Sequence, residues 1–313
     1  MKIARVFPVI TKYSPSDAHV YNGPPSLLSG LEDYDEIHIS CIFTWHLERA
    51  RWLVDQWELQ YPGRVRLGGP AVPGDVADEF TPGRYLKRGV TTTSRGCPNK
   101  CRFCLVPERE GRIRTLNQIH PGHLVQDNNL LACPREHRAR VYQMLRGQQG
   151  VRFIGGLESR RLTQWDVDEM RSIPGLASLH FACDAPRDLL PLRRALDLCR
   201  GVFPREMLRC FVMVAFDPAE TVDDAEERLH KVIEAGAYPF VQLYQPPGET
   251  KRRFSSEWRD LRTRYSSMRI LRTVIWDIEH GRDPRVRTRG LRDHEDHESL
   301  GLFAGDSKGN RDA

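Results

Sequence analysis

Three cysteines, Cys97, Cys101 and Cys104, stand in one short stretch with the spacing C-x₃-C-x₂-C. Thiolates are soft ligands that suit iron–sulfur clusters and zinc. Three of them can hold three corners of a cubic 4Fe–4S cluster, and the fourth iron then has no protein ligand in the stretch. Such an open iron can bind and activate a small molecule. The spacing therefore predicts a cluster with one open iron.

A zinc site is the alternative interpretation of the same cysteines. Structural zinc takes four protein ligands, and the candidates for the fourth, His120, His123 and Cys133, stand at no familiar short spacing. With the net charge of +5, this alternative would be a zinc-bearing nucleic-acid-binding module without catalytic activity. The charge permits a nucleic-acid partner but does not require one.

Charged neighbours and the remaining cysteines add two expectations. Lys100 and Arg102 flank Cys101, and we expect their charge to favour the thiolate form. In a reducing compartment we expect no disulfides, and the other cysteines should be small core residues. These scattered cysteines are Cys41, Cys133, Cys183, Cys199 and Cys210.

From Gly89 onward, strand-like and helix-like stretches alternate, with strands that begin about thirty residues apart. Two capping boxes, Thr163–Asp166 and Thr221–Asp224, mark helix starts. Six such βα units predict an α/β fold with a partial barrel of parallel strands, whose ligands lie at the carboxyl ends of the strands. The predicted strands are Val90–Ser94, His123–Asp127, Val151–Gly155, Ser178–Cys183, Arg209–Ala215 and Phe240–Gln245.

Residues 1–88 predict a smaller α/β unit in front of the barrel. The order strand, helix, strand indicates a parallel sheet. The predicted elements are strands Ile3–Phe7, Glu36–Phe43 and Val65–Pro70 and the helix His46–Tyr61.

The chain after the barrel divides into a helix and a tail. Residues 254–280 predict one helix that packs on the barrel, which completes a unit of residues 89–280. Residues 281–313 are charged and poor in apolar side chains, which predicts a flexible tail. The chain has no apolar run of transmembrane length and begins in a strand-like run, so we expect no membrane contact, no secretory signal and a cytoplasmic location.

The cysteine stretch, with Phe103 before its third cysteine, resembles the cluster loop of radical S-adenosylmethionine (SAM) enzymes. Its place after the first strand of six βα units is similar, and Arg95–Pro98 resembles the branch with an N-terminal cobalamin-binding-like domain. The resemblance implies that Cys97, Cys101 and Cys104 hold a 4Fe–4S cluster whose open iron binds SAM. It implies reductive cleavage of SAM to methionine and a 5′-deoxyadenosyl radical, which abstracts hydrogen from an unknown substrate.

The resemblance also implies that SAM meets the turn after the second strand. Family members commonly have a Gly-Gly-Glu-like turn there for the SAM amino group, and this chain has Asp127-Asn128-Asn129 instead. Asp127 and Asn128 offer oxygens that can accept hydrogen bonds from an ammonium group. A turn with Asx capping is the equal alternative.

The other residues implied to contact SAM are Phe103 and residues at the ends of later strands. Glu158 and Arg160 end the third strand, where Arg160 can hold a carboxylate or form a surface ion pair. Asp184 ends the fourth strand, where it can face the SAM ribose or start a helix. Tyr244 ends the sixth strand, where family members contact adenine.

The N-terminal unit raises the question of cobalamin. Asp17-Ala18-His19 followed by Gly23 is close to the D-x-H-x-x-G pattern of cobalamin-binding proteins, but its glycine is one place late. We therefore expect a shortened, Rossmann-like relative that has lost cobalamin and caps the barrel or shapes the substrate pocket. The resemblance further implies one cluster per chain and a flavodoxin- or ferredoxin-type electron donor.

Overall fold

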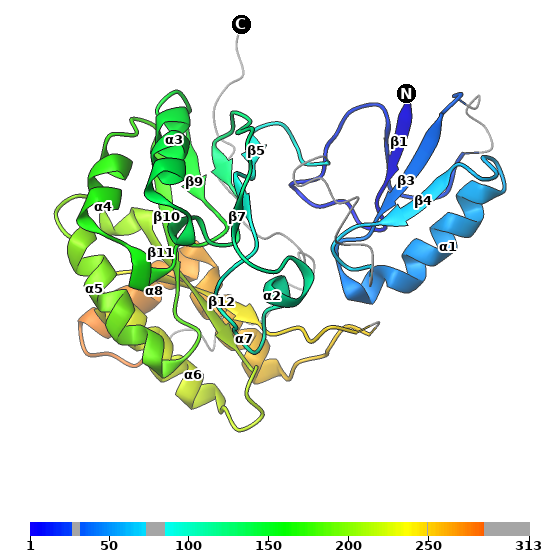
Figure 1. The fold of residues 1–313 in the computed structure, drawn as a ribbon. Coiled ribbons are helices and arrows are strands. Elements are labelled where there is room, and N and C mark those ends of the chain that lie inside the picture. The colour runs from blue at the N-terminus through cyan, green and yellow to red at the C-terminus, as the bar shows by residue number, and fades with distance from the viewer. Residues whose placement is uncertain (27–31, 73–84, 249, 285–313) are drawn as a thin grey trace, which may run out of the picture.

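The computed structural model describes residues 1–26, 32–72, 85–248 and 250–284. These residues form two parallel sheets, a short antiparallel strand pair and eight α-helices (Figure 1). Figure 1 shows the two sheets in separate parts of the molecule, with the N-terminal sheet beside the larger one. The predicted tail lies outside the described residues from residue 285 onward.

The N-terminal sheet has four parallel strands in the order β2-β1-β3-β4. Helix α1 places Ala50, Leu53 and Trp57 against the sheet, and these side chains are at most 2% exposed. The predicted strands and helix of this unit are confirmed, with slightly shorter bounds. The elements are β1 (Ile3–Val6), β2 (Val20–Tyr21), β3 (Glu36–Ser40), α1 (Leu47–Glu58) and β4 (Val65–Gly68).

The larger sheet has six parallel strands that follow one another in chain order. The six predicted strands therefore exist, in the predicted direction. Among the described residues the sheet does not close into a barrel, because β5 and β12 are its two edges. The strands are β5 (Val90–Thr91), β8 (Leu124–Val125), β9 (Val151–Phe153), β10 (Leu176–Ala182), β11 (Leu208–Val214) and β12 (Tyr238–Leu243).

Helices follow the strands as predicted, and both predicted capping boxes are present at Thr163 and Thr221. The single helix predicted for residues 254–280 is wrong. Two helices occur instead. Ser267 has an extended backbone, and the Ser266 side chain hydrogen-bonds to the backbone of Val241 in β12, an edge strand of the sheet. The helices are α3 (Arg135–Leu145), α4 (Gln164–Arg171), α5 (Leu189–Cys199), α6 (Val222–Glu234), α7 (Ser256–Ser266) and α8 (Met268–Glu279).

The two faces of the six-stranded sheet differ. The face toward the helices is closed, and Phe153, Phe181 and Val212 on it are at most 1% exposed. Side chains alternate between faces along a strand, so the neighbours of these residues share the other face. We call this second face the open face. Its residues include Leu124, Arg152, Ser178, His180, Ala182, Arg209, Phe211, Tyr238 and Phe240.

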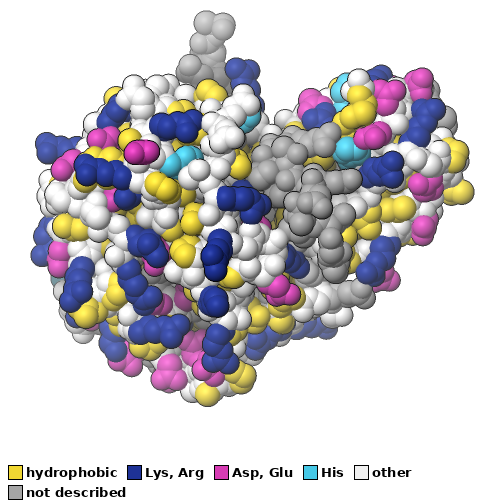
Figure 2. All heavy atoms as spheres, viewed as in Figure 1, with side chains coloured by type: hydrophobic (Ala, Val, Ile, Leu, Met, Phe, Trp, Pro, Cys, Tyr) yellow, Lys and Arg dark blue, Asp and Glu magenta, His cyan; other side chains and the backbone are white. Residues whose placement is uncertain are grey.

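The scattered cysteines belong to the cores, as predicted. Cys41, Cys183, Cys199 and Cys210 are 0% exposed, and Cys133 is 4% exposed. No helix in the described part of the chain is long and apolar enough to cross a bilayer. On the face seen in Figure 2, Lys and Arg side chains are spread over the larger unit among acidic side chains.

Candidate functional site

The cysteine loop leaves the carboxyl end of β5 and is closed at its base by a strand pair. The predicted strand Val90–Ser94 is wrong beyond Thr91, since the chain leaves the sheet there and resumes as β6 (Ser94–Arg95). Strand β6 pairs antiparallel with β7 (Arg114–Thr115), on the far side of the loop. The three cysteines and α2 (Val106–Arg109) thus lie on one closed loop.

Gly96 allows the tight turn into the first cysteine. Its φ of +79° is in the left-handed region, and a Cβ there would lie 2.2 Å from the Arg112 carbonyl oxygen. The Cys97 amide donates to the Gly111 carbonyl at 3.1 Å. Only glycine fits this backbone, because any side chain would collide with the returning strand.

Glu110 fastens the loop, and sequence reasoning did not identify it. Its carboxylate pairs with Arg95 and accepts from the Gly96 amide at 3.2 Å. It also accepts from the Asn128 side-chain nitrogen at 2.7 Å. The Arg95–Glu110 pair is 13% and 10% exposed, so little water competes for it. Asn128 therefore joins the turn after β8 to the loop.

Asp127 supports the loop from below. Its carboxylate accepts from the Thr93 amide at 2.6 Å, the Thr93 hydroxyl at 2.5 Å and the Ser94 hydroxyl at 2.7 Å. The side chain is 2% exposed, and this burial raises the pKa of its carboxyl group. In this arrangement Asp127 binds the base of the loop and not its own turn. The Asx cap of this turn is made by Asn129, whose side-chain oxygen accepts from the Ala132 amide at 3.2 Å.

Asn129, the next residue, reaches the cysteines and was missed as a site residue. Its side-chain nitrogen donates to the Cys97 sulfur at 3.5 Å and to the Glu158 carboxylate at 2.7 Å. Glu158 also binds Arg161 at 2.7 Å. Hydrogen bonds to the sulfurs tune clusters and orient their ligands. The only sequence signal was its place in the turn after the second barrel strand.

The three thiols are free and half-buried. Among the described residues, no three His, Cys, Asp or Glu side chains come close enough together to hold one metal ion. A 4Fe–4S cluster has a different requirement, because each thiolate binds a separate iron. The three sulfurs therefore do not need to meet at one metal ion. Three soft ligands on one fastened loop fit that requirement in their chemistry.

The expected effect of the neighbouring cations on the thiols is wrong. Burial raises the pKa of Cys101 and Cys104, and the charges of the other thiols and of Asp184 raise both further. The Arg102 guanidinium instead lies over the Phe216 ring, 5.8 Å from its centre. These thiols are therefore protonated near neutral pH until a metal displaces the protons.

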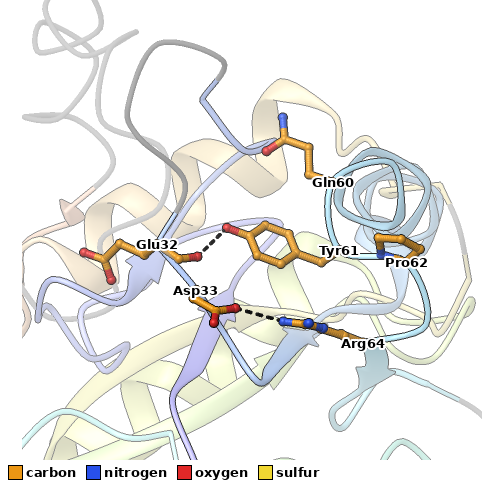
Figure 3. Close-up of a pocket in the computed structure, with 6 residues that line it drawn as sticks. All are labelled: Glu32, Asp33, Gln60, Tyr61, Pro62 and Arg64. Atoms are coloured by element: carbon orange, nitrogen blue, oxygen red, sulfur yellow. Dashed lines mark hydrogen bonds and ion pairs between the residues drawn. The ribbon is translucent and has the colours of Figure 1, made fainter.

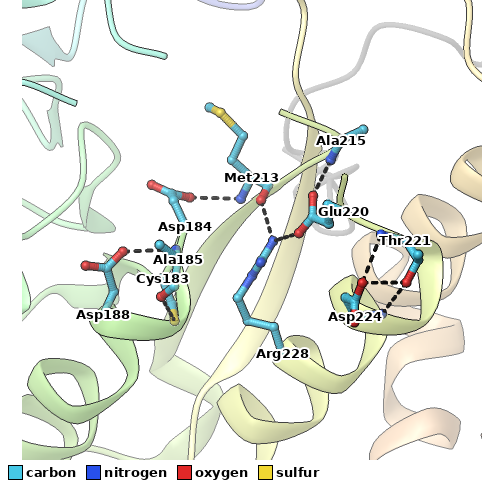
Figure 4. Close-up of polar contacts among 10 residues, drawn as sticks. All are labelled: Cys183, Asp184, Ala185, Asp188, Met213, Ala215, Glu220, Thr221, Asp224 and Arg228. Atoms are coloured by element: carbon cyan, nitrogen blue, oxygen red, sulfur yellow. Dashed lines mark hydrogen bonds and ion pairs between the residues drawn. The ribbon is translucent and has the colours of Figure 1, made fainter. Parts of the chain in front are cut away.

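Asp184 faces the cysteine loop from the end of β10. Its carboxylate accepts from the Met213 amide at 2.8 Å (Figure 4). Burial raises the pKa of Asp184 to about 6. Its charge contributes to the pKa of Cys101, so the carboxylate and the thiol are near each other. A carboxyl group that titrates near neutral pH at a strand end is a feature of functional sites.

Ala215 ends β11 in a strained conformation, with a φ of +59°. Charged side chains hold both of its backbone groups: its amide donates to Glu220 at 2.7 Å, and Arg252 donates to its carbonyl at 2.7 Å. Glu220 also pairs with Arg228 at 2.6 Å, and Arg228 donates to the Met213 carbonyl (Figure 4). This network fixes the direction in which the chain leaves β11.

Three aromatic side chains meet beside the cysteines. The Phe103 ring packs edge-on against Phe216, with centres 5.4 Å apart, and Phe216 packs edge-on against Tyr244 at 4.8 Å. The structure thus brings together two predicted residues, Phe103 and Tyr244, through Phe216, which follows the strained Ala215. The cluster gives the loop an apolar wall.

Arg160 does not join this group. It forms an ion pair with Asp188 at 2.7 Å and is half exposed, which matches the surface ion pairing weighed against a ligand role.

The carboxyl edge of the N-terminal sheet meets the site. Arg109 in α2 donates to the Pro70 carbonyl just after β4. The Gly248 amide, after β12, donates to the Thr44 hydroxyl after β3 at 3.1 Å. His19 points elsewhere, with its Nδ1 3.1 Å from the Tyr34 hydroxyl and 3.4 Å from Glu32.

A pocket of about 310 Å³ lies at the opposite, amino edge of the N-terminal sheet (Figure 3). Its charged lining is already paired, since Arg64 binds Asp33 at 3.0 Å and Glu32 binds Lys2 at 2.8 Å. Ligands of parallel sheets bind at the carboxyl edge, so this pocket does not compete with the cysteine loop as the candidate site.

Comparisons with protein-family models, with curated proteins and with solved structures found no match to this chain.

Proposed function

We propose that this chain is a radical SAM enzyme with one 4Fe–4S cluster on Cys97, Cys101 and Cys104. The observation that carries the proposal is the position of this loop. Three free thiols lie at the carboxyl end of the first of six parallel strands, with the ends of the next strands turned toward them. A parallel sheet of this kind binds its ligands at this edge.

Cys97, Cys101 and Cys104 would hold the cluster, and the cluster would supply the one-electron cleavage of SAM that allows hydrogen abstraction from the substrate, with a flavodoxin- or ferredoxin-type protein as the electron donor. The residues of the chain hold and orient the reactants. Asn129 donates to the Cys97 sulfur and fixes its direction. Asp184 is poised to accept a hydrogen bond from the SAM ribose, and the wall of Phe103, Phe216 and Tyr244 keeps water from the loop.

The N-terminal unit is proposed to act without cobalamin. His19 is engaged by Tyr34 and Glu32, away from the carboxyl edge where a cofactor of a parallel sheet would bind. Its contacts through Pro70 and Thr44 support a role as a cap over the site.

The test is anaerobic reconstitution with iron and sulfide, followed by reduction with dithionite in the presence of SAM. The proposal expects about four irons per chain and formation of 5′-deoxyadenosine. A variant with Cys97, Cys101 and Cys104 all replaced by Ala should bind no cluster and form no product, and a Cys133→Ala variant is the matched control. Stoichiometric zinc without iron uptake would instead support the zinc-bearing nucleic-acid module.

A further inference from the structure

Cations gather on the amino half of the open face. Strand register pairs Arg152 on β9 with Ser178 on β10, and His180 on β10 with Arg209 on β11. Residues paired in this way point to the same side of a parallel sheet. Both arginines are half-buried, and His180, between them, is 3% exposed.

A third cation comes from the N-terminal unit. The loop between β1 and β2 carries Lys12 and Tyr13, and the Tyr13 carbonyl accepts from the Lys87 amide at 2.8 Å. Burial and the charge of Arg152 lower the pKa of Lys12 to about 8. Lys87 lies three positions before β5, so its hydrogen bond to Tyr13 places the loop of Lys12 at the amino edge of the larger sheet.

The pKa of His180 is affected by the same three cations. Burial is the largest cause, and together with the charges of Arg209, Arg152 and Lys12 it lowers the pKa of His180 to about 3. Its Nε2 lies 3.0 Å from the Ser178 hydroxyl. The three cations thus surround a neutral, hydrogen-bonded imidazole.

Cations placed together in a half-buried site repel one another unless an anion joins them. Arg209 contacts the Met268 sulfur and lies over the Tyr238 ring at 5.2 Å. The positive charges of Arg152 and Arg272 act on Arg209, and of the carboxylates only the charge of Glu206 opposes them. None of the ion pairs found among the described residues includes Arg152 or Arg209. An anionic ligand would relieve this repulsion.

The next residues of the open face toward the carboxyl edge of the sheet are accessible to solvent. Ala182 is exposed although it ends a central strand, and it is paired with Phe211, which is paired with Phe240. The two phenyl rings pack edge-on, with centres 6.0 Å apart. The small side chain of Ala182 leaves room for a ligand beside an aromatic wall.

This space leads to the cysteine loop. Asp184 follows His180 by four positions, which corresponds to about 13 Å of extended chain. Asp184 lies near the thiol of Cys101. A molecule anchored at the cations would therefore extend along Ala182 toward the thiols.

We propose that the open face binds an organic anion with an apolar or aromatic body, whose anionic group is held by Arg152, Arg209 and Lys12 and whose body lies over Ala182 and Phe211. The binding site stands on these residues alone, and its assignment to the substrate rests on the proposed function. Lys12 gives the N-terminal unit a part in binding that substrate.

The test measures the dissociation constants of inorganic phosphate and of phenyl phosphate by calorimetry, with the full chain at constant ionic strength. Arg152→Gln should weaken both ligands about tenfold or more, because a charge-assisted hydrogen bond is lost. Arg193→Gln, which removes an exposed charge from helix α5, is the matched control and should change neither. Ala182→Leu should weaken phenyl phosphate but leave inorganic phosphate unchanged, which also shows that this variant is folded.

Three results would overturn the proposal. They are no binding of either ligand to the unaltered chain, equal affinity in the Arg152→Gln variant, and equal losses from Arg152→Gln and Arg193→Gln. Equal loss of both ligands in Ala182→Leu would overturn the placement of the body. The titration needs neither cluster nor reductant, so its failure and a failure of SAM cleavage are separate results.

Discussion

The two faces of the six-stranded sheet have the same strands but different environments. On the helix side, Phe181 and Val212 are completely buried among apolar neighbours. On the open face, the adjacent residues Ala182 and Phe211 remain accessible, next to two arginines and a buried histidine. Burial of the apolar face stabilises the fold, whereas the half-buried arginines on the other face of the same strands add no hydrophobic stabilisation. This difference is why we propose ligand binding at the open face and at the carboxyl edge above it.

The largest expected effect comes from a comparison of two phenylalanines on neighbouring strands, one on each face of the sheet. Phe181→Ala should lower the free energy of unfolding by about 3–5 kcal/mol, because it leaves a cavity in a fully packed core. Phe211→Ala should cost less than half of that, since its side chain is only half-buried. Urea denaturation of both variants measures the two values. Equal costs would contradict the distinction between the faces.

A smaller effect is expected at the carboxyl edge. Glu220→Ala should lower the free energy of unfolding by about 2–3 kcal/mol, because it leaves the Arg228 charge without its carboxylate and the Ala215 amide without its acceptor. Adding Ala215→Gly should recover part of this loss, since glycine adopts a positive φ without strain. Denaturation of the single and double variants separates the two contributions. No recovery would show that Ala215 is not strained.

The smallest expected effect is on the pH dependence of the free energy of unfolding, to which His180 on the open face contributes. The pKa of His180 is about 3 in the folded protein and near 6.5 in an unfolded chain. Between these values the unfolded chain binds more protons, so stability falls as pH falls, by at most about 1.4 kcal/mol per pH unit. His180→Gln should remove this part of the slope. Denaturation between pH 6.5 and 5 compares the two proteins, and parallel curves would contradict a buried neutral histidine.

The sequence predicted the parts of the fold that depend on local pattern. Both capping boxes form at the predicted threonines, because a capping box needs only residues three positions apart. The six parallel strands follow from the alternation of apolar strands and helices. The break at Ser267 was not predictable in this way, since it depends on Val241 of a distant strand.

The candidate site was predictable in its position but not in its contacts. The spacing of the cysteines identified the loop, yet Glu110 and Asn129 hold it through residues 14 or more positions away. The loop that carries Lys12 belongs to the N-terminal unit and meets the larger unit through the bond between Tyr13 and Lys87. The charges beside Cys101 in the sequence predicted a lowered pKa, whereas burial by the folded chain raises it. Such effects depend on tertiary contacts that spacing does not contain.

The central claim is that the cluster on this loop has one iron open to SAM. The most direct measurement is the electron paramagnetic resonance spectrum of the reconstituted, reduced protein with and without SAM. The account predicts the spectrum of a reduced 4Fe–4S cluster whose g-values shift when SAM is added, because the amino and carboxylate groups of SAM bind the open iron. A cluster spectrum that SAM leaves unchanged, or no cluster spectrum at all, would contradict it.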